Sequence, residues 1–375
     1  MQPVSARSLL LVILVVFGCF AILEVAARRL VTGSTPFEQR FPVDAVRGPV
    51  PYSMFGGVPN AALGAGYDIA ERLNSQGYRG REATEPKPLG ELRVVVLGGS
   101  TVFEGEPALP ELLERELQKR GIAKVACFNF GVVSSVSGME VSRLLFEVTE
   151  LQPDLVVFYG GGNDLLLPAV YDPRPGYPFN FVVYESNPLL RRDPSTFPSF
   201  ALFAYGSQLL RTVVPGYFEK RFVDLAALRE RVGYGSEEWK ANIAATYVKN
   251  LGRGHHLARA WDADFVAFFQ PLVFYKPDPG PVETAILGQN AALGPLVVDL
   301  RARVQKDLGP LRDREGVAVH DLSGIYDKVK TDIFVDVVHT AAQGKEIIAR
   351  AMADQLARRP SLRGSEPPRK TASGG

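Results

Sequence analysis

Residues 94–101 read VVVLGGST, so an apolar run ends in two glycines and a serine follows at position 100. The apolar residues predict a buried β-strand, and the two glycines let the chain turn sharply enough to expose the next side chain. In a parallel α/β sheet, ligands bind beyond the carboxyl ends of the strands. Ser100 is therefore a candidate nucleophile, although a serine at such a turn also serves as a helix cap.

Three further motifs, each following an apolar run, recur in a fixed order along the chain: VACFNFG ending at Gly131, LVVFYGGGND containing Asn163, and DVVH from Asp336 to His339. Together with the first motif they resemble the SGNH (GDSL-like) hydrolase family, which is named for its serine, glycine, asparagine and histidine. The resemblance covers residues 91–358, with a poorly matching insertion in the middle.

The residue types also predict nucleophilic catalysis without the family name. A serine hydroxyl needs a base to take its proton and a third group to orient that base. A separation of three residues allows Asp336 to hold Nδ1–H of His339 while Nε2 faces Ser100. The following TAAQ, from Thr340, fits a capping box, so we expect the histidine to lie just before a helix.

The resemblance also implies an oxyanion hole formed by the backbone N–H groups of Ser100 and Gly131 and the side-chain amide of Asn163. Glycine suits the second position because it has no Cβ to block the approach of a substrate. The sequence departs from the commonest Gly-Asp-Ser pattern by having Gly99 before the serine. No metal and no organic cofactor are implied.

The other histidines are weaker candidates for the base. His255 and His256 lie in a polar helical pattern without cysteine or carboxylate neighbours at metal-ligand spacing, and His320 lies in an alternating strand pattern. None of the three stands in an Asp-x-x-His frame. We expect no zinc site at His255 and His256 and a structural role for His320.

Composition indicates an ordinary folded protein. The 375 residues are 46% hydrophobic and 22% charged, with a formal net charge of +1, so a nucleic acid partner is not expected. Cys19 lies in an apolar segment and Cys127 in a predicted buried strand, so no disulfide is expected within the domain.

The amino end contains an unbroken apolar run over residues 9–23, and counting on through Glu24 to Ala27 gives a stretch of nineteen residues between Arg7 and Arg28. As a helix it spans about 28 Å, close to the hydrocarbon thickness of a bilayer. It is either an uncleaved anchor or a signal peptide cut after Ala27, and the anchor is the preferred interpretation. A signal-like segment at the extreme amino end usually exports the domain behind it, so we expect a single-pass protein of the cytoplasmic membrane with its catalytic domain on the extracytoplasmic (periplasmic) side.

The sequence divides into five parts: an anchor or signal segment at 1–30, a stalk and lead-in at 31–90, a hydrolase-like domain at 91–358, an insertion rich in proline and aromatic residues at 168–220 within it, and a disordered tail at 359–375. Within the lead-in, NSQGYRG (74–80) is similar to a segment found in related membrane-anchored proteins. We expect it to pack against the domain, and leave open whether Arg79 reaches a substrate.

Strand patterns alternate with amphipathic helical patterns across the domain, as in residues 107–120 and 139–151. This alternation predicts a parallel sheet with right-handed crossovers, covered by helices on both faces. The predicted fold is a three-layer α/β/α sandwich of the SGNH or flavodoxin-like type, with an added transmembrane helix.

The function that the resemblance implies is hydrolysis of an ester, in particular an acetyl ester, on an extracytoplasmic carbohydrate. Ser100 forms an acyl-serine, and His339 and Asp336 complete the triad. Three alternatives stay open at this point. One is transfer of the acyl group to a polysaccharide hydroxyl by the same residues, and another is a non-catalytic carbohydrate-binding or assembly protein on a hydrolase scaffold. The third is lipase or phospholipase action, which a position near the membrane permits but for which no residue specifies a long acyl pocket.

Overall fold

The computed structural model describes residues 6–30, 73–178, 207–214 and 225–362. The chain divides into two compact units. The first contains helices α1 (Ala6–Leu30) and α11 (Gln208–Val213), and the second contains the sheet and the remaining elements except one helix that the boundary divides. The boundary between the units falls within α13 (Leu225–Arg231).

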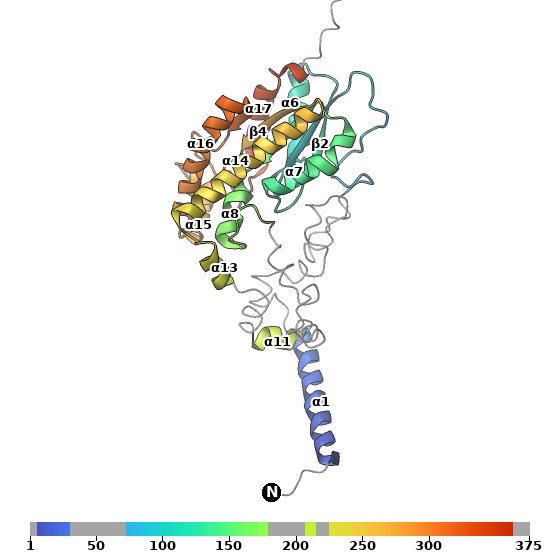
Figure 1. Ribbon diagram of the computed structural model, residues 1–375, viewed down its shortest axis with the longest axis vertical. Helices are drawn as coiled ribbons and strands as arrows, with labels where there is room; N and C mark the ends of the chain where they lie inside the picture. Colours follow the sequence, from blue (N-terminus) through green and yellow to red (C-terminus); the bar gives the residue numbers. More distant parts are fainter. Residues whose placement is uncertain (1–5, 31–72, 179–206, 215–224, 363–375) are drawn as a thin grey trace, which may run out of the picture. The chain divides into compact units, whose positions relative to one another are not determined.

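A five-stranded parallel sheet forms the centre of the second unit (Figure 1). Its strands are β1 (Leu92–Gly98), β2 (Val125–Gly131), β3 (Leu155–Gly160), β4 (Asp264–Phe269) and β5 (Ala318–Asp321). Their spatial order, β2-β1-β3-β4-β5, is the doubly wound order of flavodoxin-like folds. Because Gly98 lies opposite both Gly131 and Tyr159, the three central motifs end at the same edge of the sheet.

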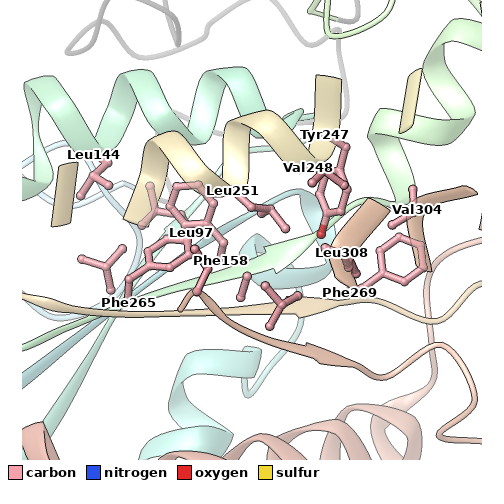
Figure 2. Close-up of a cluster of buried hydrophobic side chains, with 14 of the residues drawn as sticks. Leu97, Leu144, Phe158, Tyr247, Val248, Leu251, Phe265, Phe269, Val304 and Leu308 are labelled. Atoms are coloured by element: carbon pink, nitrogen blue, oxygen red, sulfur yellow. The ribbon is translucent and has the colours of Figure 1, made fainter. Parts of the chain in front are cut away.

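One face of the sheet is covered by α7 (Ser137–Phe146), α8 (Gly162–Val170), α14 (Glu237–Ala260) and α16 (Gly294–Glu315). Figure 2 shows part of this core, where Phe158 and Phe265 of the sheet meet Leu251 of α14. A Cβ at Gly254 would lie 2.9 Å from both phenylalanine rings, so a glycine there lets α14 approach the sheet closely.

The other face is covered by α6 (Leu109–Lys119) and α17 (Ala342–Leu356), whose apolar sides pack on the valines of β1 and β3. The remaining elements are α15 (Pro281–Gln289), the short α5 (Ser100–Phe103), and the 3-10 helices η2 (Val148–Leu151), η3 (Val273–Tyr275) and η4 (Pro360–Leu362). Two helical layers on a parallel sheet confirm the predicted three-layer α/β/α architecture.

Two boundaries differ from the sequence-based expectations. Helix α8 continues through Pro168 to Val170, so the insertion begins later than residue 168. Arg359 pairs with Asp264, and Leu362 is 2% exposed, so residues 359–362 belong to the folded domain rather than to a tail. Residues 31–72, most of the insertion and residues 363–375 lie outside the described residues.

The segment 74–80 packs against the domain. Asn74 accepts hydrogen bonds from the backbone of Gln76 and Tyr78 and donates to the carbonyls of Gly80 and Arg81, so it closes the loop on itself. Arg79 forms a bridge to the middle of the sheet's edge strand β2.

The first unit contains one helix that is long and apolar enough to cross a membrane, over Leu10–Leu30, with a mean hydropathy of 2.8. Both a membrane anchor and a signal sequence have these properties. Near its carboxyl end, Glu24 accepts hydrogen bonds from the Ser207 hydroxyl and from the backbone N–H groups of Gln208 and Leu209, where α11 begins.

Candidate active site

Ser100 lies at the turn between β1 and α5, where it is the first residue of the helix. A Cβ at Gly98 would lie 2.2 Å from the carbonyl oxygen of Tyr159, so only glycine fits where the strand ends. Ser100 is 6% exposed. This turn therefore holds one hydroxyl at the carboxyl edge of the sheet.

His339 and Asp336 complete a continuous hydrogen-bonded chain with that hydroxyl. Nε2 of His339 lies 2.7 Å from Oγ of Ser100, and its Nδ1 lies 2.7 Å from Oδ2 of Asp336. The other carboxylate oxygen, Oδ1, accepts the backbone N–H groups of Val338 and His339 at 2.8 and 2.7 Å. The carboxylate is thus fixed by its own loop, and the three side chains have the spatial relation that a serine–histidine–aspartate triad requires.

The same contacts set the protonation of the two side chains. The hydrogen bond with Asp336 raises the pKa of His339 above its ordinary 6.5, against the effect of burial. Burial raises the pKa of Asp336, but the hydrogen bonds from His339 and Val338 outweigh it, so the pKa of Asp336 lies below its ordinary 3.8. An ionised Asp336 therefore supports an imidazole that is more basic than that of an ordinary histidine.

Asn163 lies in the first turn of α8, beyond the end of β3. Its Nδ2 donates to the carbonyl of Ser135 at 2.8 Å, which fixes the orientation of the amide and leaves its second N–H to point elsewhere. A Cβ at Gly99 would lie 2.6 Å from this Nδ2. The departure from the commonest family pattern thus has a physical reason, because glycine makes room for Asn163 beside the nucleophile.

Asp164, the next residue, ties α8 to α7. Its buried carboxylate accepts both the backbone N–H and the hydroxyl of Ser137, and Asn250 donates to that hydroxyl at 3.0 Å. Burial raises the pKa of Asp164 to about 6, although the bonds from Ser137 oppose this. Since Ser135 lies just before α7, Asp164 helps to hold the carbonyl that orients Asn163.

The structure does not present Gly131 as a free donor. Its backbone N–H donates to Oδ1 of Asn129 at 3.0 Å, and a Cβ there would lie 2.5 Å from the backbone nitrogen of Phe103. Glycine is required at this position because α5 packs against the end of β2. The expected role of Gly131 as an oxyanion donor therefore does not match the geometry, whereas Ser100 and Asn163 lie where the sequence places them.

Two residues hold the carboxyl end of α5, and sequence reasoning did not assign this role to either. Asn129 donates to the carbonyl of Val102 at 3.0 Å. Arg79 donates to the carbonyls of Phe103 and Gly105 and pairs with Glu106. Because α5 begins with Ser100, both side chains fix the helix that carries the nucleophile. The guanidinium of Arg79 is engaged with the protein rather than directed at a substrate.

The remaining histidines lie apart from this chain of contacts. His255 and His256 are on α14, and His320 is on β5, stacked on Phe268 at 5.2 Å between ring centroids. Within the described ranges no group of three or more His, Cys, Asp or Glu side chains is arranged to hold a metal ion. Cys19 and Cys127 are free thiols.

One local prediction is wrong. Helix α17 begins at Ala342 with Ala341 as its N-cap, and no side chain caps it. Thr340 does not start a capping box because it forms an antiparallel bridge with Phe334 across the loop that carries His339.

No family model and no curated protein matches the chain. Solved structures of similar fold include an acetyl-xylooligosaccharide esterase from Geobacillus stearothermophilus, 12% identical, covering 71% of this chain and 94% of that chain at a TM-score of 0.40. A lipase/acylhydrolase from Enterococcus faecalis is 15% identical, covering 71% and 95%, at 0.39. A GDSL-like lipase from Bacteroides thetaiotaomicron is 12% identical, covering 71% and 87%, at 0.36.

The sheet order and the site geometry of this chain say more about its fold and its candidate active site than these distant structural similarities do. A flavodoxin-like sheet carries Ser100, Asn163 and the Asp336–His339 pair at one edge, in the chain order of the family motifs. The chain has a flavodoxin-like α/β/α fold with this arrangement of side chains at one edge of its sheet. Of the four sequence motifs, the second, which ends at Gly131, is the one whose geometry departs from expectation.

Proposed function

We propose that the protein is a serine esterase that works through an acyl-serine intermediate. The observation that carries the proposal is the unbroken chain from Ser100 through His339 to Asp336, with 2.7 Å at each step. A nucleophile, a base and an orienting carboxylate in this arrangement have one common chemical use, which is acyl transfer.

The steps follow from the positions of these groups. His339 Nε2 takes the proton of Ser100 as Oγ attacks the ester carbonyl, and the resulting oxyanion is stabilised by the backbone N–H of Ser100 and the free N–H of Asn163. The imidazolium then gives its proton to the departing alcohol, which leaves an acyl-serine. A water molecule repeats the sequence, releasing the carboxylic acid and restoring Ser100.

Acetyl esters on extracytoplasmic carbohydrates are the proposed substrates, a choice that rests on the resemblance to the SGNH family. The side chains beside the nucleophile are consistent with a short acyl group. Thr101 donates to Oε1 of the buried Gln270 at 3.3 Å, which places a polar contact next to Ser100. Long hydrocarbon chains require an apolar pocket instead.

The activity test uses the full-length protein in detergent with 4-nitrophenyl acetate, 4-nitrophenyl palmitate and an acetylated xylo-oligosaccharide. We expect release of acetate from the first and third and slow turnover of the palmitate. Adding a non-acetylated sugar acceptor separates hydrolysis from transfer, because a transferase yields acetylated acceptor in place of free acetate. Absence of both products from folded protein favours the non-catalytic alternative.

We further propose that α1 is retained as a membrane anchor and that the catalytic domain lies on the extracytoplasmic side. The support for retention is Glu24, which caps the start of α11 by accepting three hydrogen bonds and also pairs with Arg28 at 2.7 Å. Cleavage after Ala27 removes this carboxylate and leaves the α11 N–H groups without their acceptor.

Mass mapping of the amino terminus tests retention. In protein purified from membranes we expect peptides that contain residues before Ala27, and we expect Glu24→Ala to increase proteolysis within 207–214. Mature protein that begins at Arg28 contradicts the anchor. Digestion of sealed cells and spheroplasts by an added protease reports the side on which the domain lies.

A further inference from the structure

The loop that carries Asp336 and His339 is closed on itself by backbone contacts. Phe334 and Thr340 form an antiparallel bridge, Val335 N–H donates to the carbonyl of His339 at 2.9 Å, and Ala341 N–H donates to that of Ile333 at 2.8 Å. These bonds fix the shape of the loop, here called the base loop (residues 331–341). Because all of these bonds lie within the base loop, they do not fix the distance between the loop and Ser100.

A buried carboxylate on another element holds the start of the base loop. Oε1 of Glu283, on α15, accepts the backbone N–H groups of Ile333 and Phe334 at 2.7 and 3.0 Å. The Glu283 side chain is fully buried, and Ile333 and Phe334 are buried with it. Two charge-assisted bonds to consecutive amides define both the position and the orientation of the chain just before Asp336.

The other oxygen of Glu283 makes an ion pair inside the protein. Oε2 accepts from Nζ of Lys276, which is also buried, and from the N–H of Gly280 at 2.8 Å. Nζ of Lys276 donates in addition to the carbonyl of Thr331 at 2.6 Å. The ion pair therefore contacts the base loop at both Thr331 and Ile333.

The contact between α15 and the base loop is reciprocal. Oδ1 of Asp332 accepts the N–H groups of Val282 and Glu283 at 3.1 Å each, in the first turn of α15. A buried ion pair is costly to desolvate, and replacing one by apolar residues is often neutral for stability or even favourable. Stability alone is thus a weak reason for this arrangement, whereas its bonds to Thr331, Ile333 and Phe334 connect it to the placement of the neighbouring loop.

We propose that Glu283, neutralised by Lys276, is a positioning residue that sets the distance between His339 and Ser100. The proposal rests on the proposed esterase function, because it assigns the pair a role in that reaction. Neither side chain touches the reacting groups. Their effect on rate comes through the base loop, and a shift of about 1 Å in such a group costs on the order of 10²-fold in rate.

The test compares three variants of the full-length protein. Glu283→Gln keeps an oxygen for Ile333 and Phe334 but turns an N–H₂ group toward the donors of Lys276 and Gly280, so we expect kcat to fall about 10²-fold with KM nearly unchanged. Adding Lys276→Met to it removes one opposing donor and restores part of kcat. The third variant, Lys276→Met with Glu283→Met, keeps an apolar core without the acceptor, and we expect it to fold and to be slow.

A matched control is Asp264→Asn, which breaks the Arg359–Asp264 pair at the amino end of β4. We expect this control to lower Tm without changing kcat. A purely structural role predicts the same result for the Glu283 variants, whereas a positioning role predicts a loss of kcat, and two substrate-independent measurements check the difference. They are the low-field proton resonance of His339 Nδ1–H and the pH dependence of inactivation by a serine-directed phosphonate, and we expect Glu283→Gln to alter both.

The outcomes separate the two proposals. If wild-type protein does not react with the phosphonate, the esterase function fails. If wild type reacts and the folded Glu283 variants match it in kcat, resonance and pH dependence, the positioning role is overturned. Should Glu283→Gln not fold, the Met/Met variant gives the same decision.

Discussion

Replacement of Ser100 by alanine is expected to lower kcat for acetyl ester hydrolysis by about 10⁶-fold, to the limit of detection. The hydroxyl is the attacking atom, and no other side chain lies within hydrogen-bonding distance of His339 Nε2 among the described residues. Substrate binding needs no proton transfer, so Kd for a non-hydrolysable substrate analogue stays near the wild-type value. Initial rates and equilibrium binding, measured on the same preparation, check both expectations.

Asn163→Ala is expected to lower kcat less than Ser100→Ala does, so the two variants are compared. One oxyanion donor contributes about 10² to 10³ in kcat, so this variant stays measurable while Ser100→Ala does not. Equal activity of Ser100→Ala and wild type contradicts the role of Ser100 as nucleophile, whatever the behaviour of Asn163→Ala.

Asp336→Asn is expected to lower kcat on the order of 10⁴-fold. An amide at this position donates a hydrogen bond to His339 Nδ1 instead of accepting one from it. The ring proton of the neutral histidine then lies on Nε2, which faces Ser100, so Nε2 has no lone pair to accept the serine proton. The histidine then occupies the wrong tautomer for a base. The measurement is kcat on 4-nitrophenyl acetate, with circular dichroism to show that the fold is kept.

The pH dependence gives a second readout for the same change. His339 acts as a base only when neutral, so kcat/KM rises with pH through the pKa of His339, which Asp336 holds above 6.5. Removing the carboxylate charge lowers that pKa, and the acid limb moves to lower pH in Asp336→Asn. An acid limb that does not shift in Asp336→Asn is inconsistent with His339 as the base. So is a wild-type kcat/KM that does not change between about pH 5 and 8.

The position of the site could be predicted because a parallel sheet brings strand ends to one edge. Ser100 and Asn163 each follow a strand of apolar residues, and those strands are neighbours, so their motifs meet without any knowledge of the loops. The Asp-x-x-His spacing predicts the pairing of His339 with Asp336, and in the structure Nδ1 lies 2.7 Å from the carboxylate.

The residues that hold the catalytic side chains in place could not be predicted in the same way. Gly131 follows a strand like the others, but its N–H is taken by Asn129, a side chain two positions earlier, and no spacing rule reports which acceptor an amide finds. Glu283 and the base loop are distant in sequence, and a buried glutamate in a helix gives no periodic signal. Thr340 fits a capping pattern, yet its bridge to Phe334 directs it to another role.

Mass spectrometry of the protein after reaction with a serine-directed phosphonate tests most directly whether Ser100 is the nucleophile. We expect one adduct per chain, on the tryptic peptide that contains Ser100, with a labelling rate that rises with pH and falls strongly in Asp336→Asn. Folded wild-type protein that remains unlabelled, or that carries the adduct on a different residue, contradicts the assignment of Ser100 as the nucleophile.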